Sequence, residues 1–194
     1  MIQGLNLSII LLVVVVLFFV VDYGFMNRYD RERDANKGWS WDYTLFTIGM
    51  GLVVILQPWL FPFLGLATNN LFGVGFQILG GGLILASFVL HIWARQHLRQ
   101  FYVERVELQD KHQVIRTGPY AYVRHPIITT FFGLAFGVML LNPSIITLAV
   151  TVYTIWDFTK AAREEEELLK KSLPDYAAYM EQTPRFFPRL KRTS

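Results

Sequence analysis

Apolar residues gather in five charge-free segments, and these segments set the expected architecture. They are residues 5–21, 43–66, 71–90, 126–141 and 144–156, and the second is broken by Pro58 and Pro62. A helix needs about 20 apolar residues to cross a bilayer, and the last two segments are shorter than that. Only Asn142 and Pro143 separate those two, and so short a connection predicts an antiparallel helical hairpin. The pattern therefore predicts an all-α integral membrane protein with five transmembrane helices, in a single membrane domain of residues 1–194.

Lysine and arginine are confined to three of the segments that flank the apolar ones. Of the 18 basic residues, four lie in residues 22–42, six in 91–125 and eight in 157–194, while the other two connections hold none. Basic loops stay in the cytoplasm, so this pattern predicts a multi-pass protein with its N-terminus outside and its C-terminus in the cytoplasm. The alternative for the final hairpin is a re-entrant loop. The first apolar segment lacks a basic start and a small-residue cleavage site, so a removed signal peptide is not expected.

The composition of the chain excludes several kinds of catalytic and metal-binding site. The 194 residues are 53% hydrophobic, with a mean hydropathy of +0.35, a net charge of +3 and no cysteine. Disulfides, thiolate zinc sites and cysteine nucleophiles are thereby excluded. No pair of the four histidines has the spacing of metal ligands, so no metal site is predicted. The positive charge follows the membrane topology and does not indicate a nucleic-acid partner.

Two polar blocks flank the predicted hairpin, one before it and one after it. The first block is residues 118–126 and the second is residues 163–167. An antiparallel hairpin brings both blocks to the same membrane surface. The start of a helix at Pro126, beside Arg124 and His125, can bind a carboxylate through free backbone N–H groups. The simpler alternatives are that Arg124 and His125 reach the lipid headgroups and that the glutamates form a solvated face.

The remaining elements are predicted from helix signals. The third segment is expected to continue as a helix through Leu98, and its glycines indicate close helix packing. A helix continuing the fifth segment is expected to reach Lys171 and to end before Pro174. Tyr176, Tyr179 and Met180 predict a short helix on the membrane surface, and the aromatic and basic residues of 185–192 predict an interfacial anchor.

The second half of the chain resembles the isoprenylcysteine carboxyl methyltransferase family, whose relatives include phospholipid N-methyltransferases. The resemblance covers residues 105–188. It rests on the order and spacing of these pieces: His112-Gln113-Val114-Ile115, Gly118-Pro119-Tyr120, Arg124-His125-Pro126, Asn142-Pro143, the glutamate run, Tyr176 and Tyr179, and Thr183-Pro184-Arg185-Phe186.

The resemblance implies an S-adenosylmethionine-dependent methyltransferase that acts on the carboxylate of a prenylcysteine. Arg124 and His125 are expected to be catalytic, and Lys160 to bind the substrate. The cofactor S-adenosylmethionine is expected at Arg105, His112, Gln113, Val114, Ile115, Gly118, Tyr120, His125, Pro126, Ile127, Ile128, Glu164 and Glu167. Which of the glutamates 164–167 points inward is left open.

The chain departs from the family pattern at two positions. Ile128 stands where the family usually has tyrosine, and Lys160 stands where it has an arginine, which loses a bidentate fork. The expected partners are the lipid bilayer and a prenylated small molecule or protein C-terminus, with no nucleic acid and no metal. The alternatives are a phospholipid N-methyltransferase, a membrane reductase that uses NADPH, and a non-catalytic membrane subunit.

Overall fold

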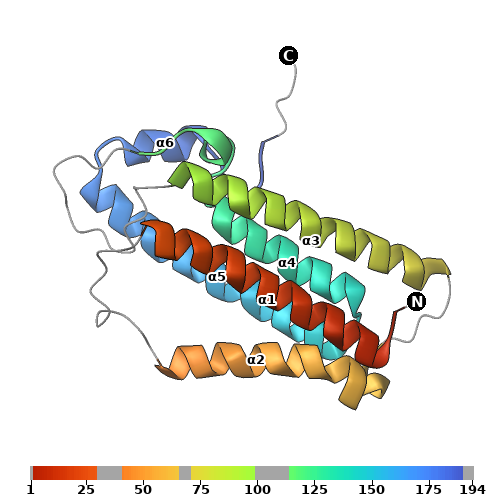
Figure 1. Cartoon of the computed structure of the whole chain (residues 1–194). Coiled ribbons are helices and arrows are strands. Elements are labelled where there is room, and N and C mark those ends of the chain that lie inside the picture. The colour runs from red at the N-terminus through yellow and green to blue at the C-terminus, as the bar shows by residue number, and fades with distance from the viewer. Residues whose placement is uncertain (1, 30–40, 66–70, 99–113, 190–194) are drawn as a thin grey trace. The chain divides into compact units, whose positions relative to one another are not determined.

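The computed structural model describes residues 2–29, 41–65, 71–98 and 114–189, and this part of the chain is helical (Figure 1). Its α-helices are α1 (Gly4–Tyr29), α2 (Trp41–Leu60), α3 (Leu71–Leu98), α4 (Pro126–Leu141), α5 (Ile145–Ser172) and α6 (Tyr176–Gln182). Two short 3-10 helices, η1 (Pro62–Leu64) and η3 (Gly118–Ala121), lie between them. The predicted all-α fold is therefore confirmed for the described residues.

Two of the described helices are long and apolar enough to cross a membrane. They are Gly4–Asp22, within α1, and Leu71–Leu98, which is all of α3. Two further apolar helices, Leu45–Leu60 and Pro126–Leu141, are shorter. The finding agrees with a membrane protein.

The second apolar segment, residues 43–66, was expected to be a span broken by Pro58 and Pro62. In the structure Pro58 lies inside α2, and the helix ends at Leu60, before Pro62. Proline lacks a backbone N–H and pushes the preceding residue out of the helical region, so Pro62 ends α2. Phe61 accordingly has φ −132° and ψ 57°, and a single 3-10 turn follows it. The side chain of Gln57 donates to the Phe61 carbonyl at 3.0 Å, which satisfies one of the acceptors left at the helix end.

The chain divides into two compact units, and α3, α4 and α5 contribute to both. The first unit is residues 1–85 with 134–153, and the second is residues 86–133 with 154–194. In the first unit α1 packs on α2. There α3 and α4 approach closely at two glycines, because a Cβ at Gly80 would lie 2.6 Å from the Gly137 carbonyl oxygen. The packing role predicted for the glycines of the third segment is therefore confirmed at Gly80. It is wrong at Gly75, Gly81 and Gly82, where an added Cβ would meet nothing within 4 Å.

The turn between α4 and α5 is closed by polar side chains of the first unit. The Ser144 hydroxyl accepts from the Thr147 backbone N–H at 3.1 Å, and the Thr147 hydroxyl accepts from the Ser144 backbone N–H at 3.1 Å. This reciprocal pair has the pattern of a capping box and starts α5. The Asn142 amide donates to the Gln57 Oε1 atom at 2.6 Å. The buried turn therefore has its polar groups bonded, and it ties α2 to the hairpin.

The hairpin is antiparallel, as the two-residue connection predicts. The Thr151 hydroxyl, on α5, lies 3.2 Å from the Ala135 carbonyl, on α4, so residues at comparable distances from the turn face each other. The helix α5 then continues far beyond its apolar part to Ser172, just before Leu173 and Pro174. The predicted extension through Lys171 is therefore confirmed, and it brings the glutamate run into the second unit.

Candidate functional site

All the described side chains of the candidate site belong to the second unit. Its first component is the turn η3, which leads into α4. Gly118 has φ +58°, a conformation that side chains disfavour. A Cβ at this position would also lie 2.4 Å from the His97 ring. Gly118 was predicted to bind the cofactor, and the structure gives it a conformational role in the turn as well.

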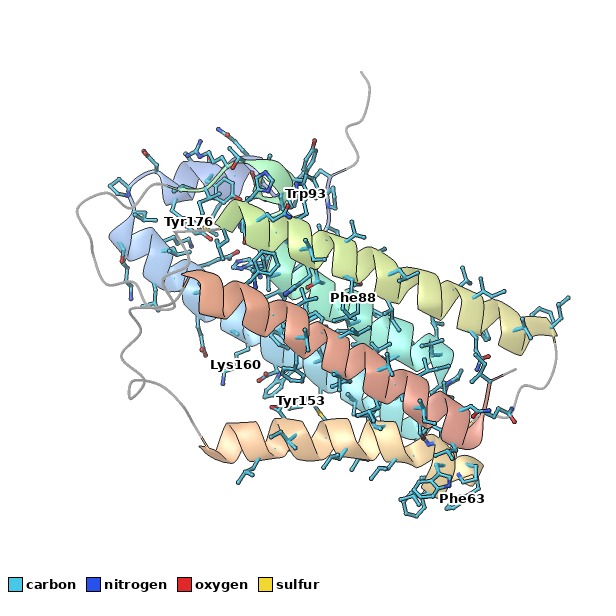
Figure 2. All side chains as sticks on the ribbon, viewed as in Figure 1. Phe63, Phe88, Trp93, Tyr153, Lys160 and Tyr176 are labelled. Carbon is cyan, nitrogen blue, oxygen red and sulfur yellow. The ribbon has the colours of Figure 1, made fainter. Side chains whose placement is uncertain are left out.

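The helix α6 packs on this turn through buried tyrosines. The Tyr179 hydroxyl donates to the Tyr120 carbonyl at 2.6 Å, and burial raises the pKa of Tyr179 to about 12. Tyr176 also lies on α6 (Figure 2), and burial together with the charges of two nearby glutamates raises its pKa. The short helix itself was predicted correctly. Its tyrosines, however, are buried against the protein, and the placement of this helix on a membrane surface stays a prediction.

A buried carboxylate, Glu166, forms the centre of the site. Its Oε1 atom accepts from the Arg124 Nε atom at 2.9 Å and lies 3.1 Å from the His125 Nε2 atom. Its Oε2 atom accepts from the Arg185 Nη2 atom at 2.6 Å. Only 2% of the Glu166 side chain is exposed. The other ring nitrogen of His125 lies 3.3 Å from Glu165, whose side chain is 56% exposed. One carboxylate on α5 therefore joins the turn before α4 to the C-terminal segment.

The C-terminal segment crosses the start of α4 as an extended strap of residues 183–186. The Arg124 backbone N–H donates to the Pro184 carbonyl at 2.9 Å, and the His125 backbone N–H donates to the Arg185 carbonyl at 3.0 Å. The Thr129 hydroxyl donates to the Phe186 carbonyl at 2.9 Å. The Arg124 guanidinium also donates to the carbonyls of Met180 and Thr183. The strap is thus attached along its main chain.

The ionisation of this cluster follows from its contacts. Burial alone would raise the pKa of Glu166, but hydrogen bonds from His125, Arg185 and Arg124 outweigh it and hold this pKa far below its usual range. Burial alone would lower the pKa of His125, but hydrogen bonds to Glu165 and Glu166 outweigh it and raise this pKa. The bond to Glu166 also raises the pKa of Arg185. Glu166 is accordingly a carboxylate. Both ring nitrogens of His125 lie beside carboxylates, and these contacts are what raises its pKa.

The other predicted acidic and basic residues lie on the exposed faces of α5. Glu164 is 67% exposed and lies 3.9 Å from Lys160, which is 62% exposed. Glu167 is also exposed and pairs with Lys170 at 3.3 Å. Lys160 extends from α5 (Figure 2), with its ammonium 6.0 Å from the centre of the Trp156 ring. The structure therefore does not bring Glu164, Glu167 or Lys160 into the buried cluster.

The structure describes some of the other residues that were predicted to bind the cofactor. Arg105, His112 and Gln113 lie outside the described residues. Val114 and Ile115 are half-buried in the segment before η3. Pro126 is buried at the first position of α4, followed by the half-buried Ile127 and Ile128. Proline carries no N–H, so the open donors of this first turn come from the residues after it.

Sequence reasoning missed Glu166 and Arg185 as site residues. The glutamate run gave no signal that separates its members, because four adjacent carboxylates have the same chemistry. A helix turns about 100° per residue, so only one of them can point at the centre of the cluster. Arg185 was grouped with its aromatic neighbours as a membrane anchor. Its place directly after Thr183-Pro184, a piece of the resemblance, was the signal that could have found it.

Comparison with known proteins shows that part of this chain is similar to one protein family. Residues 79–171 match the sequence profile of the isoprenylcysteine carboxyl methyltransferase (ICMT) family. The ICMT resemblance is confirmed for these residues. They include Arg124, His125 and Glu166, while the strap lies beyond them. The match thus contains the buried centre of the candidate site.

Three curated relatives align with parts of the chain. A protein-S-isoprenylcysteine O-methyltransferase of Mus musculus is 34% identical over 94 residues, which are 46% of this chain and 32% of that protein. The protein of the same name from Saccharomyces cerevisiae is 26% identical over 132 residues, 66% of this chain and 55% of that protein. A nickel-cobalt-cadmium resistance protein of Alcaligenes xylosoxydans xylosoxydans is 30% identical over 80 residues, 40% of this chain and 37% of that protein. The matches to the mouse and Alcaligenes proteins span about a third of their length.

The central role of Glu166 predicts a large difference between neighbouring glutamates. Glu166→Gln should lower the free energy of unfolding by about 3–5 kcal/mol, because it leaves buried cations without their partner. The exposed Glu164→Gln is the matched control and should change little. Thermal unfolding in detergent measures both. Equal losses in the two variants would contradict the assignment of Glu166 as the centre.

The pKa shifts of His125 and Glu166 predict how stability depends on pH. The raised pKa of His125 means that its contribution is complete below its ordinary value of 6.5 and is lost as pH rises through the raised value. The lowered pKa of Glu166 means that its contribution is complete above its ordinary value of 4.5 and is lost only in strong acid.

A His125→Gln variant isolates the histidine contribution. The difference in Tm between the wild type and this variant should be largest below about pH 6.5, the ordinary pKa of histidine, and should shrink as the pH rises through the raised pKa of His125. The same comparison on His97→Gln controls for general effects of losing a histidine. A difference that grows with pH would show that His125 is held neutral.

Proposed function

We propose that this protein is an S-adenosylmethionine-dependent carboxyl O-methyltransferase that methylates a prenylcysteine-like acceptor. The observation that carries the proposal is the ICMT family match over residues 79–171, which contains the Arg124–His125–Glu166 cluster. The names of the mouse and yeast relatives supply the substrate class. The apolar helices support an acceptor with a lipid chain, because such a molecule partitions into the bilayer.

The residues at the start of α4 fit the amino-acid end of S-adenosylmethionine. Arg124, His125 and Arg185 outnumber the carboxylates of Glu165 and Glu166 when His125 is protonated, so the local field favours an anion. The first turn of α4 adds backbone donors for a carboxylate. Solvent-exposed carboxylates on α5 suit an ammonium group. The donor's carboxylate would therefore lie near the helix start and its ammonium toward α5.

Methyl transfer of this kind requires the protein to position the reactants and requires little acid–base catalysis. The donor, when bound, supplies a methyl group activated by a sulfonium. The acceptor carboxylate is already ionised at neutral pH, so no proton has to be removed from it. Its oxygen forms the new bond to the methyl carbon as the carbon–sulfur bond breaks, and a neutral thioether leaves. The residues of this site contribute by fixing the two reactants in line and by excluding water.

His125 and Arg124 act here by holding the site in shape. Both ring nitrogens of His125 already face carboxylates, and the Arg124 guanidinium is bonded to Glu166 and to two carbonyls. We therefore assign both residues a positioning role within the proposed site, in place of the direct catalytic role predicted from the sequence. Lys160 remains the proposed partner of the acceptor carboxylate. Its exposed position beside Trp156 suits a substrate that arrives along the membrane surface.

The proposed topology has five transmembrane helices, with the candidate site in the cytoplasm. It is supported by the basic residues, which all fall on one side of such an arrangement. The antiparallel pairing of α4 and α5 returns both polar blocks to one surface, and this supports the last two crossings.

Single cysteines in this cysteine-free chain test the topology. A cysteine at Ser194 should react with a membrane-impermeant thiol reagent only after the cells are permeabilised. A cysteine at Asn70, in the connection without basic residues, should react in intact cells. The reverse pattern would invert the topology, and labelling of both positions in intact cells would refute an odd number of crossings.

Methyl transfer to paired acceptors tests the activity. The purified protein should transfer a methyl group to farnesylated N-acetylcysteine roughly a thousandfold faster than to N-acetylcysteine, since each buried methylene contributes about 0.8 kcal/mol. Lys160→Met should raise the KM for the acceptor and leave the KM for the donor unchanged. Equal rates on the two acceptors would refute a lipid-modified substrate. Methylation of phosphatidylethanolamine instead would favour the phospholipid N-methyltransferase alternative.

A non-catalytic role is the second candidate. The observation behind it is the similarity to a protein named for nickel-cobalt-cadmium resistance, 30% identical over 80 residues. Within the described residues no group of histidine and acidic side chains could hold a metal ion. Calorimetric titration of the purified protein with S-adenosylmethionine separates the two candidates, because a non-catalytic subunit has no reason to bind the methyl donor.

A further inference from the structure

The strap of residues 183–186 lies beyond residues 79–171, which match the ICMT profile, yet it contacts the centre of the site. Its main chain holds the turn before α4 through the Arg124 and His125 backbone N–H groups. Phe186 packs against Phe132 of α4, with ring centres 5.0 Å apart, and against the His125 ring at 6.0 Å. The strap therefore covers the same residues that the proposed donor site uses.

Arg185 adds a side-chain contact that the main chain cannot supply. Its Nε atom lies 3.1 Å from both oxygens of Glu166, and its Nη2 atom lies 2.6 Å from Oε2. Among the described residues, Oε2 accepts a side-chain hydrogen bond from Arg185 alone, while Oε1 also serves Arg124 and His125. A planar guanidinium that bonds both oxygens fixes the plane of the carboxylate.

The plane of the Glu166 carboxylate matters because a single oxygen serves two other residues. If the carboxylate rotated about its Cγ–Cδ bond, Oε1 would leave Arg124 and His125 together. Both of these residues directly precede Pro126, the first residue of α4. Fixing Glu166 therefore fixes the start of the helix whose N–H groups face the proposed donor carboxylate.

We propose that Arg185 is a positioning residue for the methyl-donor site, acting through Glu166 on the start of α4. This inference rests on the proposed function for the identity of the ligand. The structural part of the inference, that Arg185 holds the strap and the turn before α4 together, does not depend on the proposed function. The side chain of Arg185 is 30% exposed, so it can be changed without opening a cavity in a packed core.

The test compares Arg185→Lys with Arg189→Lys. Lysine keeps the charge and cannot bond both carboxylate oxygens through a planar fork. Arg189 is an exposed residue four positions further along, whose Nη1 atom lies 3.4 Å from the Glu181 carbonyl, so it is a matched control. Arg185→Met removes the charge as well and is the stronger variant. If it does not fold, Arg185→Lys still gives the answer.

Two readouts distinguish positioning from a general loss of structure. In titration calorimetry and kinetics, Arg185→Lys should raise the Kd and the KM for S-adenosylmethionine about tenfold, the effect expected for a weakened hydrogen bond to a charged group. The acceptor KM and the kcat at saturating donor should stay within about twofold of the wild type, since the reacting groups are untouched. Arg189→Lys should match the wild type in every parameter.

Hydrogen exchange supplies a readout that needs no activity. The amides of Arg124 and His125 donate to the strap, so Arg185→Lys should lose protection there while the amides of α3 keep theirs. Unchanged donor affinity together with unchanged protection in both Arg185 variants would overturn the proposal. If the wild type binds no S-adenosylmethionine, the proposed function fails and the donor role of Arg185 fails with it. Hydrogen exchange would then test only whether Arg185 holds the strap and the turn before α4 together.

Discussion

The buried carboxylate of Glu166 is the interaction on which the second unit depends. Two arginines and a histidine converge on it from segments that are about 20 to 40 residues away in sequence. None of these partners is stable alone in its position, because an unpaired buried charge costs several kcal/mol. The turn before α4, the polar half of α5 and the strap are therefore expected to become ordered together, as one cooperative group.

The helical hairpin determines which carboxylate reaches this position. The reciprocal bonds between Ser144 and Thr147 fix the first turn of α5, and the helix then runs without interruption to Ser172. Each residue along such a helix rotates the side-chain direction by about 100°. Glu166 therefore points at the cluster while Glu164, two residues away, points to solvent.

The sequence predicted the elements well where periodic patterns and breakers are strong. The antiparallel hairpin, the extension of α5 to Lys171 and the helix at Tyr176 all follow from short connections, helix continuity and prolines. In the second apolar segment Pro62 was predicted as a break, and α2 does end before it, whereas Pro58, the other predicted break, lies inside the helix. Hydrophobicity continues after Leu60, and the backbone restriction at Pro62 stops the helix.

The candidate site was predicted less completely than the fold. Two polar blocks were expected to meet, and Arg124 and His125 do meet the glutamate run. The rotation of α5 selects Glu166 instead of Glu164, and a sequence carries no independent measure of that rotation. Arg185 was predicted as a membrane anchor, because its long-range partner is invisible from its neighbours. In both cases the missing information is which distant side chain a residue faces.

The hydrogen bonds between the main chain of the strap and the start of α4 all run in the same direction. In the backbone contacts described above, carbonyl groups of residues 183–186 accept and residues 124–129 donate. A proline keeps its carbonyl while lacking an N–H, so Pro184 takes part in this attachment without any lost bond. Every amino acid offers the same acceptor. The main-chain attachment of the strap therefore does not depend on its side chains, while Arg185 and Phe186 add side-chain contacts of their own.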